Sequence, residues 1–451
     1  MIKKLFRSII VALLAVESRA ILRKYKPKII AITGNLGKTS TKDAIYQALA
    51  PHLNLRRSEK SFNSEIGVPL SILGRPNVWG SAKGWVSNLL HGLGLILFRE
   101  PYPEWLVLEV GADRVGDIKQ LAKWLKPDIA VFTGVPAVPV HIEFFPTRDS
   151  LVKEKRFLLA SVRSGGTIIV NHDDADTVEL ITWLKQHQGE CTIISYGFNE
   201  GASFRASNDN YIYDTVGEGM DVPKGITFKF DHAGNSMPLS VAGIFGRQQI
   251  YPILAALAVG TVLKLNLVTL SQGLTEYEAP SGRGRLLKGE KGSLILDDSY
   301  NSSPLALEAA LEALGAIKAG RRIAVLGDMM ELGSQTIEAH RAVGKQVTKS
   351  VDFLITVGLR AKFIAEAAKE QPARPPTESG AGGGMSPDKI MSFDEVSAAA
   401  TALEPLITAG DLILVKGSQS TRLEKLVLEI MADPTLAPNL LCRQEKEWEE
   451  R

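Results

Sequence analysis

The sequence predicts an α/β protein, in which a central domain with a mostly parallel sheet is followed by a second, Rossmann-like α/β domain. Three observations support this: short apolar runs that end at glycine or a polar residue, helical stretches between those runs, and a glycine-rich turn after the first run. Buried strands that alternate with helices are typical of parallel sheets. At 451 residues, the chain is long enough for two or three domains.

Composition excludes several classes of protein. With 45% hydrophobic and 23% charged residues, the chain has the balance of a globular protein. The net charge of +2 argues against an extended nucleic-acid surface, so no nucleic-acid partner is expected. The two cysteines, Cys191 and Cys442, provide neither a disulfide framework nor a zinc-ligand spacing. We therefore expect a reducing, cytoplasmic setting.

Residues 1–27 predict a basic amphipathic helix. Their apolar run, residues 9–16, is shorter than the roughly 20 residues that cross a bilayer, and no small-residue cleavage site follows it. One helical face is apolar and cations lie at both ends, a pattern typical of helices on anionic membrane surfaces. A helix packed on its own domain fits equally well. The apolar face comprises Leu5, Ile9, Ala12, Leu13, Val16 and Ala20, and the cations are Lys3, Lys4, Arg7, Arg19, Arg23 and Lys24.

The central domain is predicted to span residues 28–279. A strand over 28–33 leads through the glycine-rich turn into a helix, and further buried strands are expected at 105–112, 129–135 and 167–171. From about 190 to 245 the alternating pattern predicts a small β-rich appendage. Residues 76–103 are apolar with almost no acid, so they are either core or, with residues 1–27, a peripheral membrane or partner contact.

The second α/β domain is predicted to span residues 280–432. Strands are expected at 293–300, 322–328, 353–358 and 411–418, with helices over 304–318, 335–349 and 360–369 between them. The Pro- and Gly-rich stretch 371–387 is predicted to be a mobile loop. Residues 433–451 form a charged tail, which we interpret as a solvated terminus.

The turn after the first strand has the composition of a phosphate-binding P-loop. A strand that delivers such a turn to a helix N-terminus points successive backbone N–H groups at one spot, where phosphate is the natural ligand. Lys38 would reach the terminal phosphates and the Thr39 hydroxyl would ligate Mg²⁺. The alternative is a tight turn that needs glycine only for its dihedral angles. The predicted loop residues are Gly34, Asn35, Leu36, Gly37, Lys38, Thr39 and Ser40.

Three further side chains follow strands of the same sheet. Glu109 closes the strand at 105–112, at the edge where open α/β sheets bind ligands, and a carboxylate there would complete a Mg²⁺ shell. His141 follows the next strand, and Lys155 begins a helix fourteen residues later. Each has an ordinary structural explanation by itself, and their joint placement favours a site.

Several motifs, in order along the chain, resemble the Mur ligases. They are ITGNLGKTSTKD, NSEIGVPLSIL, EVGADRVGDI, VHIEFF, VKEKRFLL, NHDDAD, PSGRGRL, DDSYNSSP, VLGDMMELG with His340, and VKGS. Within the family, the chain is most similar to the group that adds D-alanyl-D-alanine to muramoyl tripeptides. The resemblance implies an ATP- and Mg²⁺-dependent amide ligase of peptidoglycan precursor synthesis. It also implies small-molecule substrates, namely a muramoyl-peptide or similar acid and an amino acid or dipeptide.

The resemblance also implies roles for individual residues. Lys38 and Thr39 would hold the phosphates and the first Mg²⁺, with Glu109 as a further ligand. His141 would match a second-metal ligand and Lys155 a carbamylated lysine, so Lys38, His141, Lys155 and Arg283 would be the catalytic group. Two further sets lie in the C-terminal domain: Arg283, Asp298 and Asn301 closing over ATP, and Lys416, Ser418 and Arg422 meeting the substrate.

The sequence departs from the family pattern at four places. Only 27 residues precede Lys28, so the UDP-sugar-binding domain is expected to be absent. Gly134 replaces an expected Asn, Gln248 and Pro252 stand where His and Asn are usual near adenosine, and Arg156 replaces a Glu. We still expect a working ATP site. Two other hypotheses stay open: an amidating or polyglutamate-type ligase, and a nonenzymatic nucleotide-binding scaffold.

Overall fold

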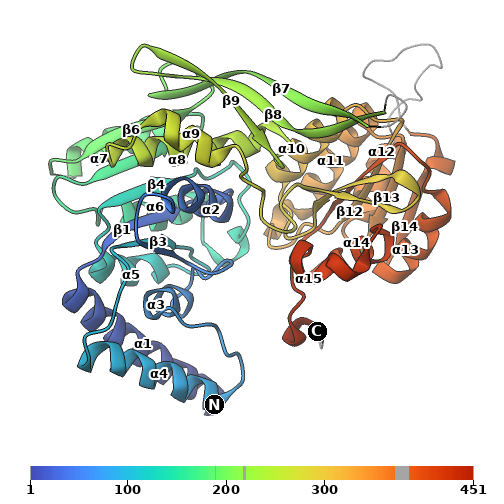
Figure 1. The fold of residues 1–451 in the computed structure, drawn as a ribbon. Helices are drawn as coiled ribbons and strands as arrows, with labels where there is room; N and C mark the ends of the chain where they lie inside the picture. The colour runs from blue at the N-terminus through green and yellow to red at the C-terminus, as the bar shows by residue number, and fades with distance from the viewer. Residues whose placement is uncertain (1, 188, 217–219, 371–384, 450–451) are drawn as a thin grey trace.

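A computed structural model of the protein describes residues 2–187, 189–216, 220–370 and 385–449. Its two sheets, one built from residues before Pro280 and one from residues after it, form two domains that lie side by side (Figure 1). The α/β fold class predicted from the sequence is confirmed. The boundaries 28–279 and 280–432 remain predictions, and most of the predicted mobile loop, 371–384, lies outside the described residues.

The first sheet has nine strands in the order β2-β3-β1-β4-β5-β6-β7-β8-β9. Its pairs from β2 to β7 are all parallel, and β1 lies between β3 and β4, with Ile32 opposite Glu109 and Thr33 opposite Phe132. The carboxyl ends of the three strands therefore share one edge. The strands are β1 (Lys28–Thr33), β2 (Leu55–Arg57), β3 (Trp105–Glu109), β4 (Ile129–Phe132), β5 (Thr167–Asn171) and β6 (Thr192–Gly197).

Helices cover both faces of this sheet, and alternate residues of β1 supply the two cores. Ile30 and Ile32 pack with α2 (Lys38–Leu49), α8 (Ile250–Val262) and α9 (Leu267–Leu274). Ile29 and Ala31 pack on the opposite side. Because a strand has a side-chain period of two, one apolar run serves both faces. The opposite side holds α3 (Gly67–Leu73), α5 (Asp117–Leu125), α6 (Arg148–Leu159) and α7 (Thr177–His187).

The β-rich segment is part of the main sheet and not a separate appendage. Strands β7 (Phe204–Val216), β8 (Met220–His232) and β9 (Asn235–Ala242) extend the sheet through antiparallel pairs, and they arch over toward the C-terminal domain (Figure 1). Lys318 Nζ lies 3.0 Å from Asp221 Oδ2, and the Lys318 backbone N–H donates to Tyr213 Oη at 3.1 Å. These strands therefore contact the C-terminal domain through Tyr213 and Asp221.

The second sheet has six strands in the order β10-β11-β15-β12-β13-β14, parallel except for β10. Asp298 at the end of β11 lies opposite Lys416 at the end of β15. The strands are β10 (Arg285–Lys288), β11 (Leu294–Asp298), β12 (Arg321–Gly327), β13 (Phe353–Val357), β14 (Ile390–Phe393) and β15 (Asp411–Lys416). The helices are α10 (Pro304–Ala316), α11 (Thr336–Ser350), α12 (Lys362–Glu370), α13 (Val396–Leu403) and α14 (Glu424–Ile430).

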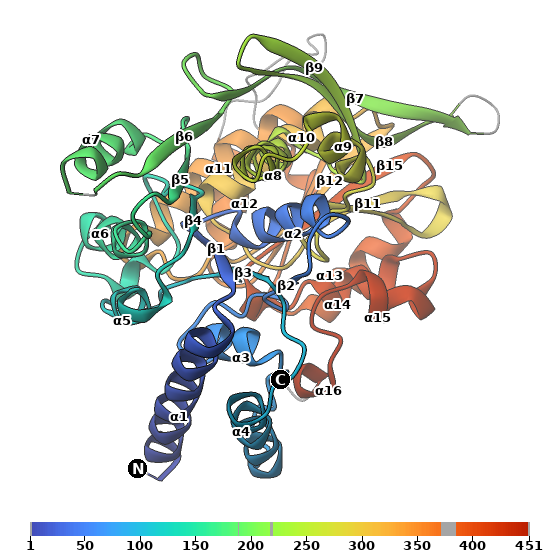
Figure 2. The ribbon, with the colours of Figure 1, turned by 60° about the vertical axis from the view of Figure 1, so that its left-hand side comes forward.

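Residues near the N-terminus form two paired helices, α1 (Ile2–Tyr25) and α4 (Ala82–Leu97), which extend from the edge of the central domain (Figure 2). The helices run parallel, since Lys24 Nζ donates to the carbonyls of Leu95 and Ile96 at 2.8 and 3.0 Å. A membrane span would need a longer apolar helix than any that the described residues contain. The helix predicted within residues 1–27 is confirmed, and its membrane contact remains a prediction.

Part of the C-terminal tail packs against the C-terminal domain: Leu441, Cys442 and Arg443 are buried, so the interpretation as solvated is wrong for this part, whereas residues 433–436 are exposed as expected. After α15 (Ala437–Leu440) the chain turns back, and Arg443 is only 8% exposed. Its guanidinium donates to Glu424 at 2.7 and 3.0 Å and to the carbonyl of Ser299 at 2.9 Å. A charged residue is buried here because a buried carboxylate and two backbone carbonyls satisfy it.

Candidate active site

A cavity of about 710 Å³ lies between the two domains. Most of the side chains that the sequence singled out line it, although they come from strands of both sheets. Gly34, Lys155, Ser418 and Arg422 are outside the lining. The predicted residues in the lining are Asn35, Leu36, Gly37, Lys38, Thr39, Ser40, Glu109, His141, Arg283, Asp298, Asn301 and Lys416.

The glycine-rich turn joins β1 to α2 at the centre of the cavity. Gly37 precedes the helix with φ of 75°, and Gly34 has φ of 145°, conformations that disfavour any side chain. Asn35 holds the turn, since its backbone N–H donates to Gly134 O at 2.8 Å and its side chain exchanges hydrogen bonds with the backbone of Val140. The N-terminal amides of α2 therefore face the cavity and can bind phosphate.

Thr39 and Glu109 form a close pair beneath the turn. Thr39 Oγ1 donates to Glu109 Oε2 at 2.8 Å, and Asn63 Nδ2 donates to Glu109 Oε1 at 2.8 Å. Arg283, from the chain that enters the second domain, donates to Thr39 Oγ1 at 3.1 Å. The hydroxyl is thus contacted from both domains.

The Thr39–Glu109 pair has the chemistry of a magnesium-binding site. Glu109 is 1% exposed, and among the described residues Lys38 and Lys42 act on it electrostatically without a close ion pair. A buried carboxylate that receives hydrogen bonds from only a hydroxyl and an amide is an incomplete charge environment. Carboxylate and hydroxyl oxygens are the ligands that Mg²⁺ prefers in proteins.

Lys38 and Lys155 lie close enough to influence each other. Burial lowers the pKa of Lys155 to about 7, and the charge of Lys38 acts in the same direction. Burial also lowers the pKa of Lys38, although Glu109 opposes the shift. Lys38 Nζ donates to Asn35 O at 3.0 Å, whereas Lys155 is 2% exposed. A neutral amine is the form that adds CO₂, so this environment suits a carbamylated lysine.

His141 lies in the cavity wall but contacts the other domain. Its Nδ1 is 2.5 Å from Glu331 Oε2, and both residues have a positive φ, of 68° and 63°. Within the described ranges, no three His, Cys, Asp or Glu side chains gather as a metal-binding group. The structure therefore brings His141 to the cavity without assembling a second metal site from these residue types alone.

The wall on the C-terminal side is built around a buried ion pair. Lys416 Nζ lies 2.6 Å from Asp298 Oδ2 and donates to Asn301 O at 3.0 Å. Burial raises the pKa of Asp298, and the charge of Lys416 partly offsets this. Tyr300 donates to Ser61 Oγ at 2.9 Å, which adds a hydrogen bond between the domains.

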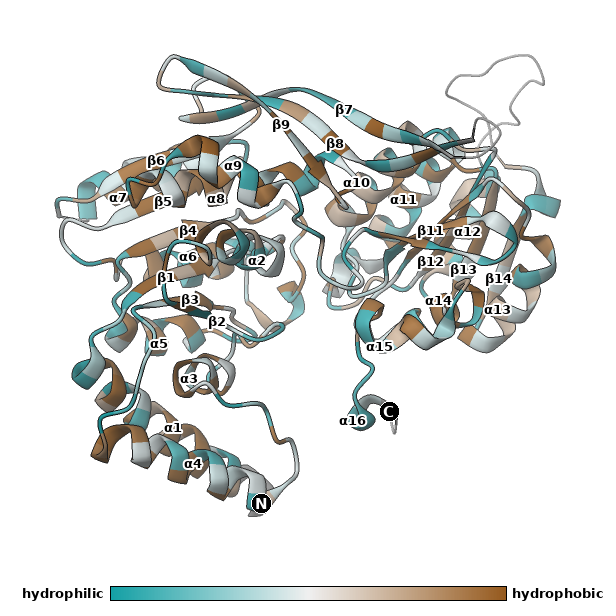
Figure 3. Cartoon of the chain, viewed as in Figure 1, coloured by the Kyte–Doolittle hydropathy of each residue, from teal (hydrophilic) through white to brown (hydrophobic). Residues whose placement is uncertain are grey.

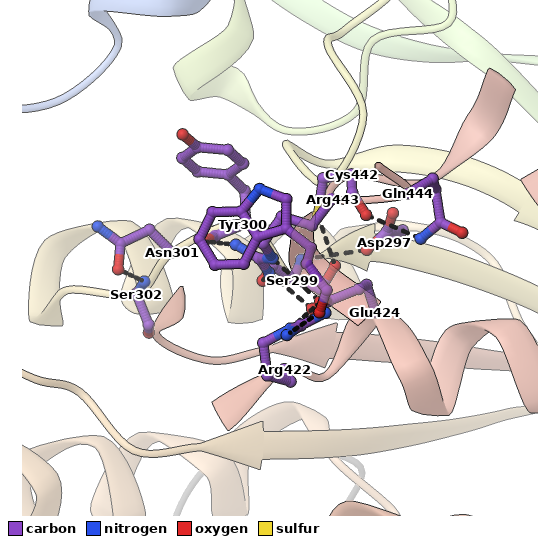
Figure 4. A network of polar contacts seen from close by, with 11 residues as sticks. Asp297, Ser299, Tyr300, Asn301, Ser302, Arg422, Glu424, Cys442, Arg443 and Gln444 are labelled. Atoms are coloured by element: carbon purple, nitrogen blue, oxygen red, sulfur yellow. Dashed lines mark hydrogen bonds and ion pairs between the residues drawn. The ribbon is translucent and has the colours of Figure 1, made fainter. Parts of the chain in front are cut away.

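The other two predicted substrate residues are engaged elsewhere. Ser418 Oγ accepts from the Met330 backbone N–H at 2.9 Å. Arg422 lies 2.5 Å from Glu424 Oε1 and donates to the carbonyl of Trp448 at 2.9 Å. Arg422 belongs to the polar network with Glu424 and Arg443 that Figure 4 shows. The contact of Ser418 and Arg422 with a substrate remains a prediction.

Sequence reasoning missed several residues of the site. Asn63 and Ser61 contact Glu109, Thr39 and Tyr300, and Asn63 begins the motif NSEIGVPLSIL without having been given a role. Tyr300 lies inside the DDSYN motif, with the guanidinium of Arg283 4.1 Å from its ring centroid. Arg443 had no sequence signal, because the partner that buries it is nineteen residues away.

Two residues at the far end of the cavity stand where the family pattern has other residues near the adenosine. Gln248 and Pro252 are in the lining, as are Tyr251 and Asp173. Tyr251 Oη donates to Asp173 Oδ2 at 2.9 Å. The lining at this end therefore combines an amide with an aromatic ring, which are suitable contacts for a heterocyclic base.

The phosphate-type turn, the buried carboxylate beside it and the second α/β domain across the cavity define a class: two-domain, nucleotide-dependent enzymes. Residues 88–260 match the model of the Mur ligase middle domain, and residues 282–419 match that of the Mur ligase, glutamate ligase domain. The two matches together cover more than half of the chain. The chain belongs to the Mur ligase family.

Relatives with one shared name match along most of the chain. The UDP-N-acetylmuramoyl-tripeptide–D-alanyl-D-alanine ligase of Bacillus subtilis (strain 168) is 25% identical over 92% of this chain and 79% of its own. The protein of that name from Synechocystis sp. is 28% identical over 91% and 76%. The crystal structure of MurF ligase from Thermotoga maritima in complex with ADP has the same fold, with a TM-score of 0.73 and 24% identity over 93% of this chain and 83% of that one.

Proposed function

We propose that the protein is an ATP-dependent amide ligase that adds D-alanyl-D-alanine to a muramoyl tripeptide during peptidoglycan precursor synthesis. The observation that carries this proposal is the cavity between the domains, where Lys38, the Thr39–Glu109 pair and Arg283 line the same wall at the N-terminus of α2. The names of the two relatives support the choice of substrates. Because ATP is supplied inside the cell, we place the reaction in the cytoplasm.

The reaction needs ATP because a carboxylate is a poor acyl donor. The γ-phosphoryl group of ATP passes to a carboxylate oxygen of the acid, giving an acyl phosphate and ADP. The amine then attacks the acyl carbon, its proton is lost, and the tetrahedral species collapses to an amide and inorganic phosphate. Throughout, negative charge gathers on the phosphoryl oxygens, so positioned positive groups are the main catalytic requirement.

Groups at the turn supply that positive charge. The Lys38 ammonium and the N-terminal amides of α2 would hold the β- and γ-phosphates, and Arg283 would contact the transferring group from the other domain. Burial makes these contacts stronger than they would be in water. Lys38 and Arg283 are therefore the two side chains on which we expect the rate to depend most.

Thr39 and Glu109 would hold a magnesium ion, and His141 and Lys155, as its carbamate, would complete the metal region. When bound, the ion supplies positive charge at the phosphoryl oxygens. The described geometry supports this set through the buried, incompletely paired Glu109 and the lowered pKa of Lys155. These side chains would determine the position of the ion's positive charge.

The C-terminal wall would complete the site. Asp298 and Asn301 would face the nucleotide, while Lys416, Ser418 and Arg422 would meet the amine substrate or hold the loops that do. Lys416 is well placed for this role because it already joins Asp298 to the backbone of Asn301.

One experiment tests the function and the acid together. Phosphate release from ATP and product mass should be measured with Mg²⁺, D-alanyl-D-alanine, and either UDP-linked or lipid-linked muramoyl tripeptide. We expect an amide product that contains the dipeptide with at least one of the two acids, and none without the dipeptide. ATP binding without any product across both acids and a panel of amines would show the proposal to be wrong and would favour a nonenzymatic scaffold.

A further inference from the structure

The buried side of the α1–α4 pair belongs to the apolar core on one face of the main sheet. In α1, Ile10, Leu14 and Ile21 are buried, and in α4, Trp85 and Leu95 are buried. With the buried residues Ser18, Asn88 and Gly92, they repeat every three to four positions and so form one stripe on each helix. One stripe of each helix is therefore used in packing, and the other faces of both helices are available for contact outside the domain.

A second apolar stripe on each helix is exposed. Of the eighteen large apolar side chains that are exposed in the described parts of the chain, nine belong to α1, α4 and the residue that caps α4. Leu90 is 62% exposed and Leu97 is 65% exposed. Figure 3 shows the hydrophobic colouring continuing along both helices of the pair. We call this set the apolar face: Phe6, Ile9, Leu13, Val16, Val86, Leu90, Leu93, Leu97 and Phe98.

The charge around the apolar face is strongly basic. Residues 1–27 and 76–103 contain nine lysines and arginines and two acids, which gives +7, while the whole chain carries +2. The remainder of the protein is therefore net acidic. One of the two acids, Glu17, points toward α4, since a Cβ on Gly92 would meet its carboxylate. The solvent side of the pair is left with an excess of cations.

The apolar face and the basic residues around it together favour one binding partner, an anionic membrane. We propose that α1 and α4 form a membrane-binding face that holds the enzyme on an anionic lipid bilayer, with the apolar face in the headgroup region. Apolar side chains flanked by lysine and arginine are the pattern that binds such surfaces in the interfacial plane. A second copy of the chain would bring two strongly positive surfaces together, which Coulomb repulsion opposes.

The geometry agrees with a peripheral position. The pair extends from the edge of the central domain (Figure 1), and the chain just before α4 contacts the C-terminal tail, where the rings of Trp79 and Trp448 lie 6.0 Å apart. None of the residues of the apolar face is in the cavity lining, so a bilayer on that face would not cover the cavity residues. Within the described chain, no helix could cross the bilayer. The enzyme would therefore lie on the bilayer surface, with the cavity lining outside the lipid contact.

Vesicle flotation with the full-length protein tests the proposal. We expect binding to vesicles of phosphatidylcholine mixed with phosphatidylglycerol, and at least tenfold weaker binding to phosphatidylcholine alone. Leu13→Glu combined with Leu90→Glu should weaken binding by a further tenfold or more, because two apolar contacts become like charges of the lipid. The matched control is Val178→Glu with Val268→Glu, which changes two exposed valines on α7 and α9. That control should bind like the unmodified protein.

A charge series completes the test. Arg23→Gln and Arg99→Gln should each weaken binding to the anionic vesicles by about fivefold, and added salt should weaken it further. Circular dichroism and ATP turnover should be unchanged in every variant, since no changed residue lies in the cavity lining. Equal binding to both vesicle types, or a loss in the valine control as large as in the leucine variant, would overturn the proposal. So would light scattering that shows the apolar face buried in a dimer.

Discussion

The two walls of the cavity are built in different ways. On the central domain, the groups at the expected phosphate position come from one short turn, residues 35–41, and from Glu109 on the neighbouring strand. The opposite wall combines Asp298, Lys416 and Arg283, which come from three separate segments, and Arg443 of the tail supports it from beneath. The phosphate side of the first wall is therefore mostly local in sequence, whereas the second wall is assembled by tertiary contacts.

This difference predicts what a mutation in each wall should affect. On the central domain, the backbone of the turn is held by its own glycines and by Asn35, so a side chain can be removed without loss of the turn. On the C-terminal side, the loop after β11 depends on a buried charge from the end of the chain. Damage to the first wall should therefore affect chemistry, and damage to the second should affect stability as well.

The largest expected effect is in the first wall. Lys38→Ala should lower phosphate release by about 10³-fold, because it removes a positive group from the position where phosphoryl charge develops. The midpoint of urea unfolding should change little, since the side chain makes a single hydrogen bond, to Asn35 O. Lys123→Ala on the exposed side of α5 is the matched control, and it should retain full activity. A large fall in stability would contradict the view that this wall is locally determined.

The next effect is in the second wall. Arg443→Ala should lower the free energy of unfolding by about 3 kcal/mol, because it leaves the buried Glu424 without its main partner. At present burial opposes ionisation of Glu424, but Arg443 and Arg422 outweigh it and hold its pKa below the usual value. Urea unfolding measures the change. The double variant Arg443→Met, Glu424→Leu should lose less than the single one, and an equal loss would exclude the buried charge as the cause.

A smaller effect concerns pH and Lys155. Because the folded-state pKa of Lys155 is about 7, its neutral fraction rises about tenfold between about pH 6 and about pH 8. At constant dissolved CO₂, phosphate release should rise by a similar factor as the amine becomes able to form a carbamate. Lys155→Glu carries a permanent carboxylate, so the rise should disappear in that variant. A rise that persists unchanged would assign the pH dependence to another group.

The smallest effect compares two tyrosines that link the domains. Tyr300→Phe removes the hydrogen bond to Ser61 beside the cavity, worth about 1 kcal/mol, and should raise KM for ATP a few-fold. Tyr213→Phe removes an interdomain hydrogen bond to the Lys318 backbone, away from the cavity. Steady-state kinetics should show a normal KM for that variant. Equal changes in both would mean that the Tyr300 contact acts only on domain docking.

Much of the fold could be predicted from the sequence, because its strands are continuous apolar runs. The first strand, the turn and the helix after it were predicted in the order and place where β1 and α2 lie, although α2 ends at Leu49. The β-rich segment was recognised as strands, but the sequence could not tell that β7 to β9 continue the main sheet, since pairing depends on partners far along the chain. For the same reason, the tail was misinterpreted as solvated.

The sequence by itself determined the turn that faces the phosphate position and the family of the chain. A strand, two glycines and a Lys-Thr pair fix a conformation through short-range dihedral preferences, which need no distant partner. Only the tertiary structure decided that Arg283 reaches Thr39, that Arg443 is buried beneath the second wall, and that α1 lies against α4. Such contacts depend on burial and on charge pairing between segments that become neighbours only when the chain folds.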